Sequence, residues 1–102
     1  MGAESFYAIA YGKNAGAAFN VAVEDAQYNY GHSGYTGSIA EKDSYKMLSK
    51  EVFESEDAAQ QFAYHLIEDG DGRIDDKWGP AGCVSFKYKD GVAYLFFGWA
   101  SS

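Results

Sequence analysis

The strongest constraint on the fold of this chain is an alternating segment, residues 84–98, that is interrupted by Asp90–Gly91. An Asp-Gly dipeptide between two alternating apolar runs is typical of a β-hairpin with a two-residue type I′ turn. Pairing Lys89 with Val92 would collect six residues on one face of the hairpin. We expect these six to be core: Val84, Phe86, Tyr88, Ala93, Leu95 and Phe97.

Local patterns predict three further elements. Residues Ser5–Tyr11 are apolar at both alternating sets of positions, which predicts an interior strand. Asn14 is a suitable N-cap for a helix that runs to about Tyr30. Ser55 is a suitable N-cap for a second helix, which ends near Asp69–Gly70.

The segment between the two helices predicts two short strands, Ser38–Ala40 and Tyr45–Leu48, around a turn at Lys42–Asp43. The order of elements is then β-α-β-β-α-β-β. This order is typical of an α+β protein, with a mainly antiparallel sheet and two helices packed on one face. Tyr94 and Phe96 would lie on the open face, where several aromatic residues together indicate either a covered face or a partner surface.

The charge balance argues against some classes of partner. The chain has 8 lysine and arginine residues against 15 aspartates and glutamates, a formal net charge of −7. Direct binding of duplex nucleic acid needs clustered basic residues, so we expect no such binding.

Hydropathy and length limit the architecture. We expect no membrane insertion, since no apolar run approaches the roughly 20 residues of a membrane helix. The length suits a single domain, residues 1–102.

The acidic residues are concentrated in one quarter of the chain. Residues 51–76 contain nine acids and Arg73, a net charge of −8, while the rest of the chain has six acids and seven lysines, a net charge of +1. The helix dipole favours acids at a helix start but opposes them at a helix end. A solvated surface, a basic partner protein and a cation site all remain open. The residues proposed for a basic partner are Glu54, Glu56, Asp57, Glu68, Asp69, Asp71, Asp75 and Asp76.

The cation hypothesis can be examined residue by residue. Residues 67–78 resemble the core of an EF-hand loop, with three aspartates at ligand positions. Ile67 stands where the first ligand would be, and Trp78 replaces the bidentate glutamate. Because two of the strongest ligands are missing, we expect no high-affinity calcium site and assign no metal ligand.

A glycine-rich loop, residues 31–38, is the second candidate site. Its backbone and hydroxyl groups could cradle a phosphate, and Tyr35 could stack on a base. The loop follows a helix instead of leading into one, and it matches neither the Walker pattern nor G-x-G-x-x-G, so a structural turn is the competing interpretation. The residues proposed for a small ligand such as a nucleotide are His32, Ser33, Tyr35, Thr36, Tyr94 and Phe96.

No group of residues indicates catalysis or a cofactor. His32, His65 and Cys83 are the only histidines and cysteine, and their spacing fits no zinc motif. We expect Cys83, at the start of a core strand, to be a buried and inert thiol. We therefore assign no catalytic residue and no cofactor, and a small hydrolase or transferase that uses His32 is a third hypothesis.

Two segments carry a resemblance to known proteins. GYTGSIAEK (34–42) and DKWGPAGC (76–83) resemble segments of small proteins of unassigned function encoded by bacteriophages and in bacterial genomes. The resemblance implies a phage-type accessory protein that acts in the bacterial cytoplasm, in host takeover or against host defence. The single cysteine fits such a reducing compartment.

The leading hypothesis is a small acidic protein that binds and modulates a basic host or defence protein, with its acids in place of nucleic-acid phosphates. The alternative is a protein that binds or sequesters a small nucleotide through residues 31–38. A homo-oligomer is compatible with both hypotheses.

Overall fold

The computed structural model describes residues 3–30, 38–39, 42–70, 72, 74, 79–89 and 91–101. In chain order these residues form β1 (Ala3–Tyr11), α1 (Ala15–Tyr30), β2 (Tyr45–Phe53), α2 (Glu56–Asp69), β3 (Ala81–Tyr88) and β4 (Gly91–Ser101). The strand order in the sheet is β1-β4-β3-β2, with β2 and β3 parallel and the other neighbours antiparallel. The expected α+β class, with two helices and a mainly antiparallel sheet, is confirmed.

The central strand β4 is buried on both faces. Phe96 and Phe97 are adjacent in sequence and both are 0% exposed, so their rings point to opposite sides of the sheet. Phe96 packs in a cluster with Ala18, Phe19, Ala22 and Ala26 of α1. Phe97 packs in a second cluster with Ala59, Ala63 and Ile67 of α2. Each face of the sheet therefore has its own core.

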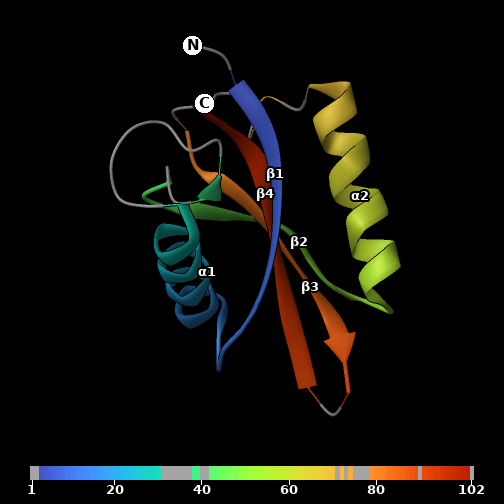
Figure 1. Cartoon of the computed structure of the whole chain (residues 1–102). Helices are drawn as coiled ribbons and strands as arrows, with labels where there is room; N and C mark the ends of the chain where they lie inside the picture. The colour runs from blue at the N-terminus through green and yellow to red at the C-terminus, as the bar shows by residue number, and fades with distance from the viewer. Residues whose placement is uncertain are drawn as a thin grey trace.

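The two helices lie on opposite faces of the sheet, as Figure 1 shows, and not on one face as the sequence suggested. Two connections explain this. Parallel strands need a crossover, and α2 supplies it between β2 and β3 on one face. The other connection joins β1 and β2, which are the two edge strands, and α1 crosses the second face between them.

The predicted strand Ser38–Ala40 is a second correction. The backbone N–H of Lys42 donates to the Ile39 carbonyl at 2.9 Å, which closes a tight turn where the strand was expected. Ile39 is buried in the cluster on the α1 side, while residue 40 lies outside the described residues. The strand that begins at Tyr45 continues to Phe53 and pairs with β3 in parallel. The described residues therefore contain one strand fewer than predicted.

Both predicted helix caps are present. The Asn14 side-chain oxygen accepts a hydrogen bond from the Ala17 N–H at 2.8 Å, and the Ser55 hydroxyl accepts one from the Ala58 N–H at 3.2 Å. Gly70 ends α2 in the left-handed conformation, with φ of 69°. Local sequence thus determines where α2 begins and ends, and it determines where α1 begins.

The β3–β4 hairpin has the expected faces in a different register. Tyr88 pairs with Gly91, and Lys89 adopts a positive φ of 51°, so the turn begins one residue earlier than predicted. As a result Phe86 lies opposite Ala93 instead of Leu95. Each residue of β3 therefore pairs with a β4 residue two positions earlier than predicted. Because side chains alternate between the two faces with a period of two, every side chain still lies on its predicted face.

Gly12 allows the chain to turn closely from β1 into α1. A Cβ atom at Gly12 would lie 2.7 Å from the backbone nitrogen of Ala18 and 3.1 Å from the carbonyl carbon of Ala17. These are backbone atoms of the first turn of α1, so they cannot rotate away as a side chain would.

We expect Gly12→Ala to lower the free energy of unfolding by about 1–3 kcal/mol, because the added methyl group forces α1 away from β1. Urea unfolding measures this loss. Gly91→Ala is the matched control, since a Cβ there meets no atom within 4 Å. Equal losses in the two variants would show that the turn is not closely packed against α1.

Candidate functional site

The described acids of residues 51–76 lie mainly at the two ends of α2. Glu56 and Asp57 are in its first turn, Glu68 and Asp69 are in its last turn, and all four are exposed. A helix of 14 residues is about 20 Å long, so these acids form two groups and not one. The helix dipole stabilises the first group and opposes the second.

The four other acids proposed for a basic partner lie outside α2. Glu54 forms an ion pair with Lys87, with 3.6 Å between carboxylate oxygen and Nζ, but both side chains are largely exposed and the pair is screened by water. Asp71, Asp75 and Asp76 lie outside the described residues. The acids that the structure places for a partner are therefore those on α2, together with Glu54 beside it.

Exposed tyrosines lie next to these acids, which the sequence analysis did not anticipate. Tyr7 and Tyr11 of β1, Tyr64 of α2 and Tyr88 of β3 are 42%, 50%, 54% and 38% exposed. The three strand tyrosines alternate with residues of the α1-side core, so they lie on the face that α2 covers. We call these four tyrosines, together with Glu56 and Glu68, the tyrosine–glutamate surface.

One end of this surface joins β1 to the last turns of α2. The Tyr64 hydroxyl forms a hydrogen bond with the Glu68 carboxylate, which raises the pKa of Tyr64 above its ordinary value of 10.0. Partial burial raises the pKa of Tyr7, and Tyr64 and Glu68 raise it further by their proximity. Tyr7, Tyr64 and Glu68 therefore form one local group between strand and helix.

The other end of the surface joins β1, β3 and the first turn of α2. The rings of Tyr11 and Tyr88 have centroids 5.0 Å apart and meet across β4, where the register partner of Tyr11 is the small residue Ala93. Partial burial, the hydrogen bond with Tyr88 and the nearby Glu56 carboxylate all raise the pKa of Tyr11.

A cation of the chain itself already occupies part of the surface. The Lys89 Nζ atom lies 5.3 Å from the centroid of the Tyr88 ring, within the range of a cation–π interaction. The Tyr88 ring is therefore oriented so that an ammonium group can approach its face.

The sequence contains a signal for this surface. Tyr7 and Tyr11 occupy alternate positions of a strand with Ile9 between them on the same face, and Tyr88 was expected to be core. What the sequence does not show is that α2 covers β2, β3 and β4 while β1 remains largely open on that side.

The structure does not bring together the residues proposed for a small ligand. His32, Ser33, Tyr35 and Thr36 lie outside the described residues. Phe96 is fully buried under α1, with its ring centroid 5.5 Å from that of Phe19, and Tyr94 is half-buried. Of the two alternatives that the sequence left open for these aromatics, the covered face is the one observed, because α1 packs over them.

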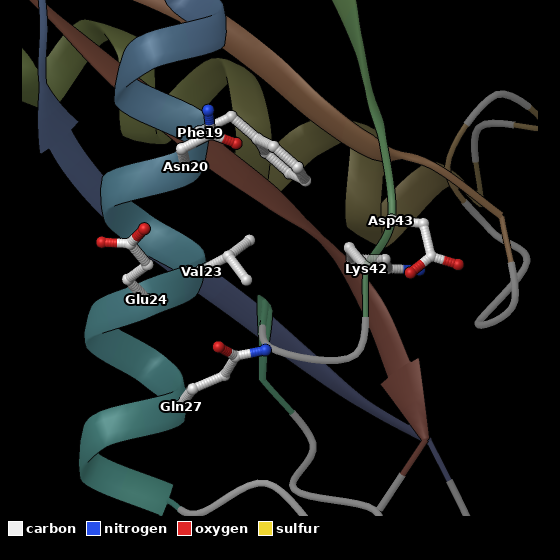
Figure 2. Close-up of a pocket in the computed structure, with 7 residues that line it drawn as sticks. All are labelled: Phe19, Asn20, Val23, Glu24, Gln27, Lys42 and Asp43. Carbon is white, nitrogen blue, oxygen red and sulfur yellow. The ribbon is translucent and has the colours of Figure 1, made fainter.

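A pocket of about 320 Å³ lies between α1 and the segment before β2. Figure 2 shows Val23 and Gln27 extending from α1 toward that segment, while Glu24 extends to the other side of the helix. Lys42 is 3% exposed, and its Nζ atom donates a hydrogen bond to the Gly79 carbonyl at 2.8 Å. The lining residues are Phe19, Asn20, Val23, Glu24, Gln27, Lys42 and Asp43.

The described residues offer little for metal or thiol chemistry. Among residues 3–30, 38–39, 42–70, 72, 74, 79–89 and 91–101, no group of three or more histidine, cysteine, aspartate or glutamate side chains is placed to hold a metal ion. Ile67, the first position of the EF-hand-like segment, is buried in α2. Cys83 is 0% exposed, and burial raises the pKa of its thiol to about 12, so the nucleophilic thiolate is scarce at neutral pH.

Comparison of the chain with protein families, with curated proteins and with solved structures gave no match. None of the helices in the described part of the chain is long and apolar enough to cross a membrane.

We expect Glu68→Gln to lower the pKa of both Tyr64 and Tyr7 toward 10.0, because the variant removes the negative charge beside them. Tyrosine ring resonances followed by NMR from pH 8 to 12 measure both values. The folded-state pKa of Tyr64 lies above that of the unfolded chain. The associated stability is therefore complete below about pH 10 and is lost as pH rises through the folded-state pKa.

Asp69→Asn is the control for this titration, since it removes the same charge from the same helix end. The titration of Tyr64 and Tyr7 should be nearly unchanged in this control. Equal shifts in the two variants would indicate a general effect of net charge and would contradict the contact with Glu68.

Proposed function

We propose that this chain is a small protein-binding domain whose partner presents a lysine- and arginine-rich surface. The observation that carries the proposal is the tyrosine–glutamate surface, where four exposed tyrosine rings lie beside the carboxylates at both ends of α2. Tyrosine is enriched at protein interfaces because its ring offers a large apolar area and its hydroxyl can still form hydrogen bonds.

The two kinds of side chain would act together on a basic partner. Carboxylates attract lysine and arginine over a distance of about a Debye length and so speed the encounter. Once in contact, a guanidinium or ammonium group gains a cation–π interaction with a tyrosine ring, as Lys89 does on Tyr88. The concentration of net charge −8 in residues 51–76 supports the same kind of partner.

The proposal extends to the biological setting that the phage-like segments imply. The partner would be a bacterial host or defence protein, and one that handles nucleic acid has the required basic surface. In that case the carboxylates of α2 would occupy the positions of backbone phosphates. Duplex DNA added as a competitor would then displace the chain from its partner.

We expect the double variant Glu56→Lys, Glu68→Lys to lose partner binding by at least about tenfold, because it replaces attraction by repulsion at both ends of α2. The measurement is capture of proteins from bacterial lysate by the immobilised chain, at low and at high salt. Circular dichroism verifies the fold of each variant.

The matched control is Glu24→Lys with Asp25→Lys, which changes the net charge equally on exposed residues of α1, on the other face of the sheet. A captured protein supports the proposal only if the control retains it and the α2 variant does not. If both variants capture the same proteins as the original chain, the α2 surface is not the binding site.

The pocket beside α1 supports a second candidate function, the binding of a small molecule. Its volume of about 320 Å³ is at the lower limit of ligand sites. Asn20 and Gln27 contribute amide groups to the pocket, and the Asp43 carboxylate opposes a phosphate. The Lys42 ammonium group also lines the pocket, but it already donates a hydrogen bond to the Gly79 carbonyl. The composition of the pocket therefore favours a nucleoside over the nucleotide that the sequence suggested.

Under this second proposal, calorimetry with a panel of nucleosides and nucleotides should give heat with a nucleoside. Val23→Trp fills the pocket and should abolish the heat. Tyr28→Ala, at a 91% exposed position of the same helix, should leave it unchanged. The absence of heat with every compound on the original chain would contradict small-molecule binding.

A further inference from the structure

The outer edge of β1 is the least protected part of the sheet. β1 is nine residues long and lies at one end of the strand order. Its only charged residue is Glu4, and it contains no proline, lysine or arginine. Within the described residues, backbone hydrogen bonds outside the helices and strands do not involve β1. Among the described residues, half of its N–H and C=O groups therefore face outward without a neighbouring strand.

The opposite edge of the sheet is protected in the usual ways. On β2 the segment from Met47 to Val52 faces only Cys83 to Ser85 of β3, so the strand bulges out of register. Lys46, Lys50 and Glu51 are exposed along it. Bulges and charged side chains, lysine above all, are what natural sheets use to prevent the addition of a further strand. β1 pairs with β4 in an unbroken register, without a bulge, and its single charged residue is Glu4 near its start, so the rest of its outer edge carries neither form of protection.

A strand added beside β1 would place alternate side chains next to the tyrosine–glutamate surface. Tyr7 and Tyr11 project from β1 on the α2 side, and residues on adjacent strands face one another at Cβ distances of about 4.5–5.5 Å. Lysine or arginine side chains at two positions four residues apart would therefore lie beside the two tyrosine rings. They would also approach Glu68 and Glu56, which are near Tyr7 and Tyr11 respectively.

We propose that the basic partner binds by β-strand addition, with an extended lysine- or arginine-rich segment pairing with the outer edge of β1. This inference rests on the proposed function and specifies how the partner binds. Main-chain hydrogen bonds to β1 provide affinity, and alternate basic side chains on the tyrosine–glutamate surface provide specificity. Charge argues for this occupant over a second copy, because two chains of net charge −7 would bring their acidic surfaces together.

The experiment is amide hydrogen exchange of the full chain by NMR, with a nine-residue peptide of alternating lysine and threonine as the probe. We expect the outward amides of β1 to exchange about tenfold more slowly when the peptide is bound. Outward amides of β2 should be unaffected. The same peptide with all its backbone nitrogens methylated keeps every side-chain charge but loses its N–H donors, and it should give no protection.

A pair of substitutions tests the side-chain part of the proposal. Tyr7→Lys places a positive charge on the α2 side of β1 and should weaken binding of the lysine peptide by about tenfold. Tyr28→Lys makes the same change at a 91% exposed position of α1 and should change binding by less than about twofold. Equal effects would overturn the placement of the peptide beside Tyr7.

The possible failures are distinguishable. If the peptide shifts the resonances of Tyr7, Tyr11 and Tyr64 without protecting β1, strand addition is wrong and the basic-partner surface stands. If protection of β1 appears without peptide and rises with protein concentration, the occupant is a second copy of the chain. If neither peptide binds at low salt, both the strand addition and the proposed function are contradicted.

Discussion

The burial of β4 on both faces is the constraint on which the rest of this structure depends. Phe96 and Phe97 are consecutive, and each must be removed from water on its own side of the sheet. Burial of both rings needs a helix on each face of the sheet, and these helices are α1 and α2. It also needs a strand on each side of β4, and these strands are β1 and β3. The α1-side core includes Phe6, Phe19 and Ala26, and the α2-side core includes Leu48, Ile67 and Phe86.

The two helices do not cover the sheet equally, and the candidate surface follows from this difference. α2 packs against β2, β3 and β4, whereas α1 packs against β1 and β4. β1 is therefore covered on one face and largely open on the other, where Tyr7 and Tyr11 remain exposed beside the acidic ends of α2. The open face and the open edge belong to the same strand, which is why a single extended partner segment can use both.

Sequence reasoning succeeded where local chemistry decides the outcome. Asn14, Ser55 and Gly70 cap helices as predicted, because their side chains or φ angles satisfy groups only a few residues away. The faces of the β3–β4 hairpin were also correct, since alternation alone determines them. The turn register was not, because Lys89 adopts a positive φ that residue propensity disfavours. The predicted strand at residue 39 failed because Ile39 contributes to the core from a turn.

By itself the sequence determined the two helices, the first strand, the alternating faces of the β3–β4 hairpin and the concentration of negative charge in residues 51–76, since these depend on residue type and spacing along the chain. Only the tertiary structure decided which face each helix covers and which strand stays open. Both depend on packing between residues far apart in sequence, such as Phe19 with Phe96 and Ala63 with Phe97. No local pattern records such contacts, because their free energy appears only when separate elements pack together.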